Sequence, residues 1–137
     1  MKYFTKTIAG IFFFLVFTGS IYAQVEKLND GVVIHLEGAN AKAIKLEVVS
    51  DRIIHVITSP VGSIQRDTSL MVIAGNKKTE WSADTKNNET TLVTSLLKVI
   101  VELSTGRIKF HDLKDQPLLE EENNGSSFTA TTIDGGP

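Results

Sequence analysis

Short runs in which apolar residues alternate with polar ones fill the chain after residue 24, and no stretch there keeps a helical period. Alternation with a period of two is typical of β-strands that bury one face, whereas an amphipathic helix repeats its apolar residues every three to four positions. The pattern therefore predicts an all-β chain of seven or eight short strands. An antiparallel β-sandwich is the architecture expected for such strands.

Turn-forming residues mark where the expected strands begin and end. Pro60 stops the run before it, because proline cannot continue a central strand. The polar stretch 75–89 is expected to separate two strands, and the tail supplies no element that would close a sandwich. The expected strands are 31–38, two strands within 43–58, 70–74, 91–94, two strands within 97–112, and 127–133 in the tail.

The best specified hairpin lies between Leu97 and Asp112, where two alternating runs meet at Gly106. A four-residue loop places the apolar partners on one face and opposite charges on the other, whereas a three-residue loop would set Val101 against Lys109. Gly106 supplies the positive φ that a tight hairpin requires. The expected pairs are Leu103 with Ile108, Val101 with Phe110, Glu102 with Lys109, and Ile100 with His111.

A second hairpin is expected within 43–58, with Ser50 and Asp51 as a two-residue turn. This turn would make one face of the hairpin apolar and would set His55 into that face. The expected pairs are Ile44 with Ile57, Leu46 with His55, and Val48 with Ile53.

The first 23 residues have the features of a secretory signal peptide. Lys2 and Lys6 precede an apolar core at 8–17, and a small residue, Ala23, stands before the expected cleavage at Gln24. A retained membrane anchor is the alternative, although the apolar core is short for a bilayer span of about 20 residues. The chain is therefore expected in the periplasm or outside the cell, with no membrane association after cleavage.

The composition limits what the exported chain can be. The chain contains no cysteine, so neither a disulfide framework nor lipid attachment at a cysteine is available. Removal of residues 1–23 takes away two of the 14 basic residues and none of the 16 acidic ones, which leaves a net charge of −4. Nucleic-acid binding is not expected, because it requires a basic face. Residues 24–137 have the length of about one domain.

Several of these segments together resemble a known family. They are DRIIHVITSP at 51–60, SLMVI at 69–73, TTLVTSLLKVIVELSTGRIKFHD at 90–112, and the following DQPLLEE. In their order they look like the N-terminal β-sandwich of glycoside hydrolase family 31, the α-glucosidase and α-xylosidase family, a domain similar in fold to galactose mutarotase. One departure from the family is His55, where members often carry arginine.

The resemblance implies a domain that does not itself carry out catalysis. Family 31 enzymes use two aspartates on a downstream (β/α)₈ barrel to cleave α-glycosidic bonds with retention, and neither aspartate lies in this chain. The sequence also stops before the Tyr-Gly-Leu-Gly type of segment with which the family continues. The chain therefore looks like the front of a longer glycosidase, with the barrel as its partner and an α-linked oligosaccharide as the substrate of the parent enzyme.

The carboxylates of the chain do not form a recognisable acid/base pair. Retaining glycoside hydrolysis needs two carboxyl groups about 5–5.5 Å apart whose pKa values are shifted in different directions. Glu120, Glu121 and Glu122 read as a solvated run, while Asp67, Asp112 and Asp115 fall at turns and strand ends, where aspartate is common. No catalytic residue is therefore predicted.

The histidines and the single tryptophan are the residues that could form a metal or sugar site. His35, His55 and His111 fall on three different expected strands with no shared face, so no metal site is predicted, and no motif indicates a cofactor. Trp81, the only tryptophan, is expected in the core or at its edge, with stacking on a sugar ring as the alternative.

Three functions remain open from the sequence. The first is a non-catalytic domain of an exported α-glycosidase that packs on the barrel and shapes the substrate entrance. The second is a free-standing β-sandwich that binds a glycan or a partner protein. An aldose mutarotase is weaker, because that chemistry needs a paired histidine and carboxylate in a larger sandwich.

Overall fold

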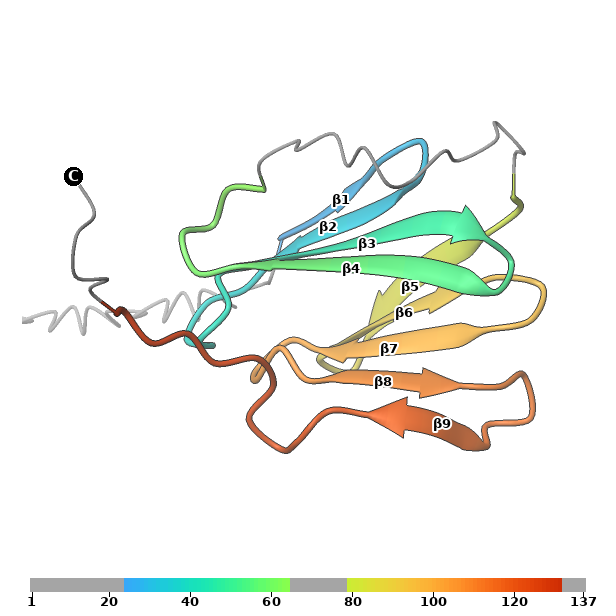
Figure 1. Ribbon diagram of the computed structural model, residues 1–137. Helices are drawn as coiled ribbons and strands as arrows, with labels where there is room; N and C mark the ends of the chain where they lie inside the picture. Colours follow the sequence, from blue (N-terminus) through green and yellow to red (C-terminus); the bar gives the residue numbers. More distant parts are fainter. Residues whose placement is uncertain (1–23, 65–78, 132–137) are drawn as a thin grey trace, which may run out of the picture.

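The structure, a computed structural model, describes residues 24–64 and 79–131 (Figure 1). Within these residues, nine strands form two antiparallel sheets and no helix is present, which confirms the predicted all-β sandwich. The same part of the chain accordingly holds no helix long and apolar enough to cross a membrane. The expected signal peptide and the expected strand 70–74 lie outside the described residues.

The first sheet contains four strands that pair in the order in which they follow along the chain. Gly31 begins the second of them in close contact with the third, since a Cβ added there would lie 1.8 Å from the carbonyl oxygen of Leu46. Only glycine allows this approach of the two backbones. The strands are β1 (Gln24–Lys27), β2 (Gly31–His35), β3 (Ala43–Ser50) and β4 (Ile53–Ser59).

The second sheet contains five strands, again paired in chain order. Asn87 and Asn88 both have positive φ and form the tight turn of its first hairpin, a conformation that asparagine tolerates better than most residues. The strands are β5 (Ser82–Lys86), β6 (Glu89–Val93), β7 (Lys98–Glu102), β8 (Ile108–His111) and β9 (Pro117–Glu120).

The core lies between the inner faces of the two sheets. Alternate residues of the central strands point inward, and each buried aliphatic side chain stabilises the fold by about 1.5–3 kcal/mol. The most deeply buried of them are Val32, Ile34, Ile44, Leu46, Leu92, Val99, Val101 and Ile108.

A pair of turns joins the sheets at one end of the sandwich. Thr94, directly after β6, is buried, and its hydroxyl donates a hydrogen bond of 2.7 Å to the carbonyl oxygen of Asp51 in the turn between β3 and β4. The same hydroxyl accepts the backbone N–H of Leu97 at 3.0 Å. Thr94 therefore organises its own turn and anchors it to the other sheet.

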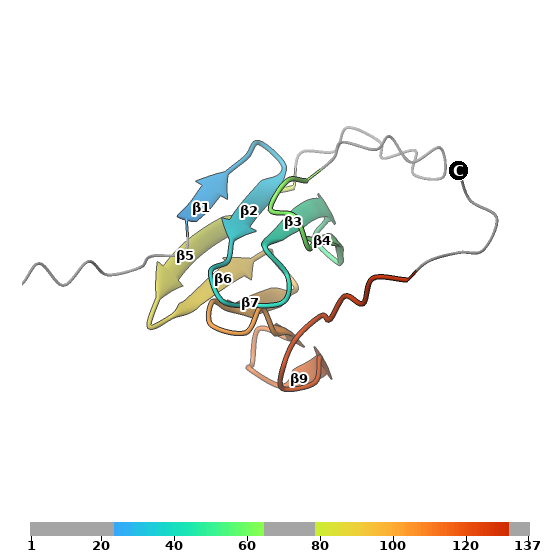
Figure 2. The same cartoon turned by 90° about the vertical axis from the view of Figure 1, so that its left-hand side faces the viewer.

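The two sheets are not parallel layers. Figure 2 shows β1 close to β5 on one side of the sandwich, while β4 and β9 lie far apart on the other. The first sheet has four strands and the second has five, and in neither view does a strand of the first sheet lie over β9. Over residues 24–64 and 79–131, the two sheets therefore spread apart along the side of β4 and β9.

The expected register of the hairpin 97–112 is wrong by two residues. The observed pairs are Lys98 with His111, Val99 with Phe110, Ile100 with Lys109, and Val101 with Ile108. The loop is longer than expected because Glu102 accepts the N–H of Gly106 at 2.8 Å and donates its own N–H to Arg107, which leaves Leu103 inside the turn. A shift of two keeps every side chain on its expected face, and Gly106 has the expected positive φ of 75°.

The expected register of the hairpin 43–58 is also wrong, and here the shift changes the faces. A β-bulge between Val48 and Ser50 adds one residue, so Leu46 pairs with Val56 and Glu47 pairs with His55. His55 is therefore not in the apolar face: about half of its side chain is exposed, and its Nδ1 lies 3.3 Å from Glu47 Oε2.

Other boundaries differ from expectation in detail. The polar stretch 75–89 contains β5, and β1 and β9 were not expected as strands. The expected strand 127–133 is not a strand over residues 127–131, and its remainder lies outside the described residues. β4 ends at Ser59, directly before Pro60, as predicted.

Candidate functional site

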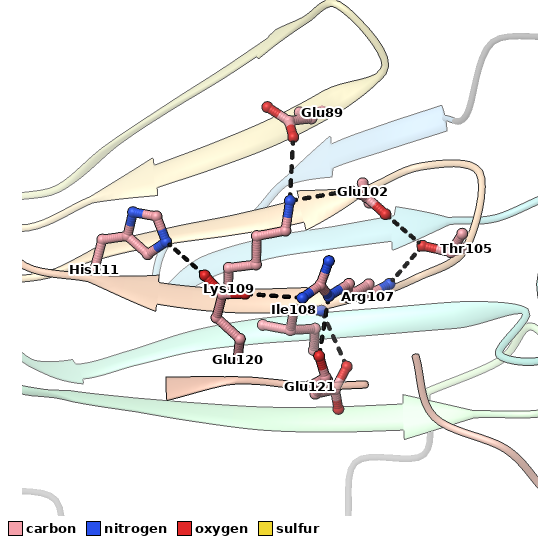
Figure 3. Close-up of polar contacts among 9 residues, drawn as sticks. All are labelled: Glu89, Glu102, Thr105, Arg107, Ile108, Lys109, His111, Glu120 and Glu121. Atoms are coloured by element: carbon pink, nitrogen blue, oxygen red, sulfur yellow. Dashed lines mark hydrogen bonds and ion pairs between the residues drawn. The ribbon is translucent and has the colours of Figure 1, made fainter. Parts of the chain in front are cut away.

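The densest group of polar contacts lies on the outer face of the second sheet (Figure 3). Alternation along the strands puts Val99, Val101, Ile108 and Phe110 toward the core, so the residues between them face outward. We refer to this group as the outer charged cluster. Its members are Glu89, Glu102, Thr105, Arg107, Lys109, His111, Glu120 and Glu121.

Lys109 occupies the centre of the cluster. Its ammonium lies 3.0 Å from Glu102 Oε1 and 3.8 Å from Glu89 Oε1, and Thr105 donates its hydroxyl to the other oxygen of Glu102 at 2.9 Å. The hydrogen bonds from Lys109 and then from Thr105 lower the pKa of Glu102, because both stabilise the ionised carboxylate. Glu102 is therefore an ionised partner of Lys109.

Arg107 ties the turn between β7 and β8 to the segment that follows β9. Its Nε donates to the carbonyl oxygen of Glu121 at 2.9 Å, and its terminal nitrogen lies 2.8 Å from Glu120 Oε2. The Glu121 carboxylate accepts the backbone N–H of Ile108 at 3.0 Å and the Ser126 hydroxyl at 3.3 Å. Of the expected solvated run, only the Glu122 carboxylate makes no hydrogen bond or ion pair with the described residues, while its carbonyl oxygen accepts the N–H of Gly125 at 3.0 Å.

His111 is the least satisfied member of the cluster. Its side chain is only 16% exposed, and neither ring nitrogen has a hydrogen-bond partner within the described part of the chain. Its Nε2 lies 3.6 Å from Glu120 Oε1, which is an ion-pair distance if the ring is protonated.

The cluster does not have the chemistry of a glycosidase site. Retaining hydrolysis needs one carboxyl group with a raised pKa that can donate a proton to the leaving group. The pKa of Glu102 is lowered instead, and the Lys109 ammonium contacts both Glu102 and Glu89. The contacts join β6, β7, β8 and the segment after β9, which is a structural role.

Two smaller ion pairs lie elsewhere on this sheet. Lys86 forms a hydrogen bond with Asp84 that lowers the pKa of the carboxyl group and raises that of the amine. Lys98 likewise lowers the pKa of Asp115 through a hydrogen bond. Both are surface pairs: the first lies within β5, and the second joins β7 to the turn between β8 and β9.

The three histidines do not come together. His35 and His55 lie at opposite ends of the outer face of the first sheet, next to Ala43 and Glu47 respectively, whereas His111 lies on the outer face of the second. Over residues 24–64 and 79–131, no group of three or more histidine, aspartate or glutamate side chains could hold a metal ion. Asp67 lies outside the described residues.

Trp81 packs against the core as a half-buried residue directly before β5. The Lys27 ammonium from β1 lies 4.9 Å from the centre of its ring, a cation–π distance. The ring therefore helps to join the edge strands β1 and β5, as expected for a residue at the edge of the core.

Comparison with known proteins bears on the fold as a whole. No protein-family model matches the chain. The chain is similar to the crystal structure of a glycoside hydrolase family 31 α-xylosidase from Xanthomonas citri, with 28% identity and a TM-score of 0.72 over 82% of this chain. It is also similar in fold to a family 31 α-xylosidase from a soil metagenome complexed with xylose, with 15% identity and a TM-score of 0.58 over 83% of this chain.

The chain resembles part of a family 31 α-xylosidase. It spans only 12% of the Xanthomonas citri protein and 19% of the soil protein. A small all-β fold of this size fits the N-terminal β-sandwich of family 31 that the sequence resembles, so the expected resemblance is confirmed.

Two residues of the outer charged cluster could be predicted from the sequence. Alternation in the two runs around Gly106 identified Glu102 and Lys109 as outward-facing residues of opposite charge. Thr105, Arg107 and Glu121 were missed, because they lie in a turn and after a short strand, where no periodicity indicates which way a side chain points.

Proposed function

We propose that this chain is a non-catalytic N-terminal domain of an exported α-glycosidase of family 31. In this proposal it packs on a downstream (β/α)₈ barrel and shapes the substrate entrance, while the barrel supplies the two catalytic aspartates. The observation that carries the proposal is the likeness to the Xanthomonas citri α-xylosidase, at 28% identity and a TM-score of 0.72 over 82% of this chain but only 12% of that one.

The electrostatics of the domain support a non-catalytic role. The carboxylates of the outer charged cluster are engaged by Lys109, Arg107 and backbone N–H groups, and the pKa of Glu102 is lowered. A domain that holds its charges in fixed pairs is suited to scaffolding. We therefore assign cleavage of the substrate, an α-linked xyloside or a related α-glucan oligosaccharide, to the parent enzyme.

Export is the second part of the proposal. The sequence pattern of residues 1–23 supports a secretory signal, and the absence of cysteine is compatible with any compartment. Fusing residues 1–30 to a reporter that is active only outside the cytoplasm tests this part. A fusion that stays inactive while a known signal peptide activates the reporter contradicts export.

The main experiment is to read the genomic frame around the chain and to express the longest protein that it encodes. We expect that protein to hydrolyse 4-nitrophenyl α-xyloside or α-glucoside, and we expect residues 24–137 alone to leave both substrates intact. The matched control is the long protein with the predicted nucleophile of its barrel changed from aspartate to asparagine.

The same experiment separates the free-standing binding module from the glycosidase domain. A stop codon directly after Pro137, together with measurable affinity of the purified chain for a glycan, would favour the binding module. A continuing frame whose product cleaves neither substrate would refute the assignment to α-glycosidases.

A further inference from the structure

The chain contains one asparagine that is directly followed by glycine, Asn124. An asparagine in this position loses its side-chain amide most readily, because glycine has no side chain that hinders attack by its own backbone nitrogen. The nitrogen of Gly125 can reach the amide carbon Cγ of Asn124 and close a five-membered ring. Asn124 is therefore the asparagine at which deamidation of the unfolded chain is expected to be fastest.

In the folded chain Asn124 lies in a tight turn after β9. Gly125 donates its N–H to the carbonyl oxygen of Glu122 at 3.0 Å, and neither Asn123 nor Asn124 has a positive φ. These two features identify a type I turn, because type II and the mirror-image turns need a positive φ at a central position. In a type I turn ψ of the third residue, here Asn124, is about 0°.

This turn keeps the reacting atoms of Asn124 and Gly125 apart. Ring closure needs the Cβ of Asn124 and the nitrogen of Gly125 on the same side of the Cα–C bond, and a ψ of about 0° turns the nitrogen about 120° away from that arrangement. The nitrogen must also give up its proton before it attacks, and its hydrogen bond to Glu122 holds the proton in place. Because Asn124 is exposed, the conformation of the turn, and not burial, slows the reaction.

The turn is held against the hairpin of β7 and β8. A Cβ added at Gly125 would lie 2.9 Å from the backbone nitrogen of Arg107 and 2.9 Å from the carbonyl oxygen of Thr105, so the two backbones are in close contact. Glu121, just before the turn, accepts a hydrogen bond of 2.9 Å from Arg107 with its carbonyl oxygen and one of 3.0 Å from the backbone of β8 with its carboxylate (Figure 3). We refer to residues 121–126 as the docked segment. The turn can change its ψ only if this segment moves away from the hairpin.

We propose that Asn124 is a deamidation site that the docked segment protects and that becomes reactive when this segment leaves the hairpin. In the open segment hydroxide takes the proton of the Gly125 nitrogen, the nitrogen bonds to Cγ of Asn124, and the side-chain amide leaves as ammonia. Water then opens the ring at either of its two carbonyl groups, which gives aspartate or isoaspartate and restores the proton on Gly125. The net reaction consumes water and releases ammonia, and nothing is oxidised or reduced.

Isoaspartate would prevent the segment from docking again. In isoaspartate the main chain runs through the former side chain, so the path from Asn123 to Gly125 is longer by one carbon atom. The bond from Gly125 to Glu122 and the close contact with the hairpin depend on the shorter path. The reaction is therefore a one-way change in the chain, and it does not depend on the glycosidase assignment.

Peptide mass spectrometry measures the reaction directly. The purified chain is incubated in mildly alkaline buffer, once folded and once unfolded in guanidinium chloride. We expect Asn124 to react faster than every other asparagine in the unfolded chain, and at least about tenfold more slowly in the folded chain, because the reaction needs local opening. Equal rates at Asn124 in the two states overturn the protection by the turn. An unfolded chain in which another asparagine reacts faster overturns the choice of site.

Two alanine variants test the docked segment. Glu121→Ala removes the carboxylate that accepts the N–H of Ile108, and Glu122→Ala is the matched control, because it removes a carboxylate without such a contact. Among the folded chains, Glu121→Ala should raise the rate at Asn124 about tenfold and Glu122→Ala should leave it unchanged, while both variants react like the parent in guanidinium chloride. Equal rates in all the folded chains overturn the role of the docked segment. If circular dichroism shows that Glu121→Ala does not fold, Ser126→Ala replaces it, since it removes only the 3.3 Å bond to Glu121 and should also raise the rate.

The deamidated chain tests whether the change is one-way. Its additional negative charge separates it from the parent chain by ion exchange. After removal of guanidinium chloride, the amide of Ile108 should exchange its hydrogen about tenfold faster in the isoaspartate chain than in the parent, because its acceptor Glu121 no longer docks. Exchange at the rate of the parent means that the segment docks again, and this result overturns the one-way change.

Discussion

Lys109 on β8 lies 3.0 Å from Glu102 on β7, although its register partner on that strand is Ile100. The contact is diagonal, which is within reach of a long side chain on a twisted antiparallel sheet. The same ammonium lies 3.8 Å from Glu89 on β6. One cation therefore links three successive strands on the outer face, opposite the hydrophobic core.

Glu102 should make the stability of the fold depend on pH. Its folded-state pKa is lowered by hydrogen bonds from Lys109 and Thr105, because both stabilise the ionised carboxylate. The contribution of Glu102 to the free energy of unfolding is therefore fully present above the ordinary glutamate pKa of about 4.3, and it is lost as the pH falls through the lowered folded-state pKa. Glu102→Gln should cost about 0.5–1 kcal/mol at pH 7. Urea unfolding of both proteins between pH 2.5 and 7 should show this difference shrinking toward zero at the acid end, and a difference that grows there contradicts the assignment.

Val101 and Lys109 should differ sharply in their effect on stability. Val101 is fully buried between the sheets, so Val101→Ala removes two methyl groups and leaves a cavity, at a cost of about 2–3 kcal/mol. Lys109→Ala removes only outer-face ion pairs and should cost less than about 1 kcal/mol. Equal unfolding free energies for the two variants would contradict this assignment of the two faces of the hairpin.

Gly31 should not tolerate any side chain. A Cβ there would lie 1.8 Å from the Leu46 carbonyl oxygen, so β2 would have to move away from β3, and Gly31→Ala should cost more than about 3 kcal/mol. Gly38→Ala is the matched control, because its Cβ would meet nothing within 4 Å and only the positive φ of 85° is unfavourable, at about 1–2 kcal/mol. Circular dichroism on heating measures both, and a folded, wild-type-like Gly31→Ala protein would contradict the close approach.

Thr94 should matter through its hydroxyl group. Thr94→Val keeps the shape of the side chain but removes the bond to the Asp51 carbonyl oxygen, which should cost about 1–3 kcal/mol. Ser95→Ala is the control, because Ser95 is exposed and its contact with Asp51 is long, at 3.4 Å. If both variants unfold at the same denaturant concentration as the parent, the two turns do not join the sheets.

The faces of the strands were more predictable than their partners. Around Gly106 the alternation is continuous, so a register error of two residues left Val101 and Lys109 on their correct sides. Around Ser50 a bulge inserts one residue, and nothing in the local pattern of Val48 to Ile53 reveals it, so His55 was placed on the wrong face. A bulge reflects how the strand fits the rest of the sheet, which a local pattern does not contain.

Short edge strands were the other source of error. β9 has only four residues and starts with proline, and β5 is almost entirely polar, because an edge strand needs little burial on either face. Such segments have the composition of loops and become strands only when β6 or β8 offers them hydrogen-bond partners. The contacts of Arg107 with Glu120 and Glu121 form only because β9 pairs with β8. Since β9 was not predicted as a strand, these contacts could not be predicted either.

The order of the strands has a consequence for how the protein is made. Among the described residues, each sheet is built from one uninterrupted stretch of chain, 24–59 for the first and 82–120 for the second, and within each sheet the strands pair in sequence order. Loops between paired strands are short, so little chain entropy is lost in forming each hairpin. During synthesis the first sheet can complete its hydrogen bonds while the second is still inside the ribosome. The apolar inner face of the first sheet stays exposed until Leu92, Val99 and Ile108 of the second sheet have been synthesised and can cover it. In that interval the nascent chain would need a chaperone most.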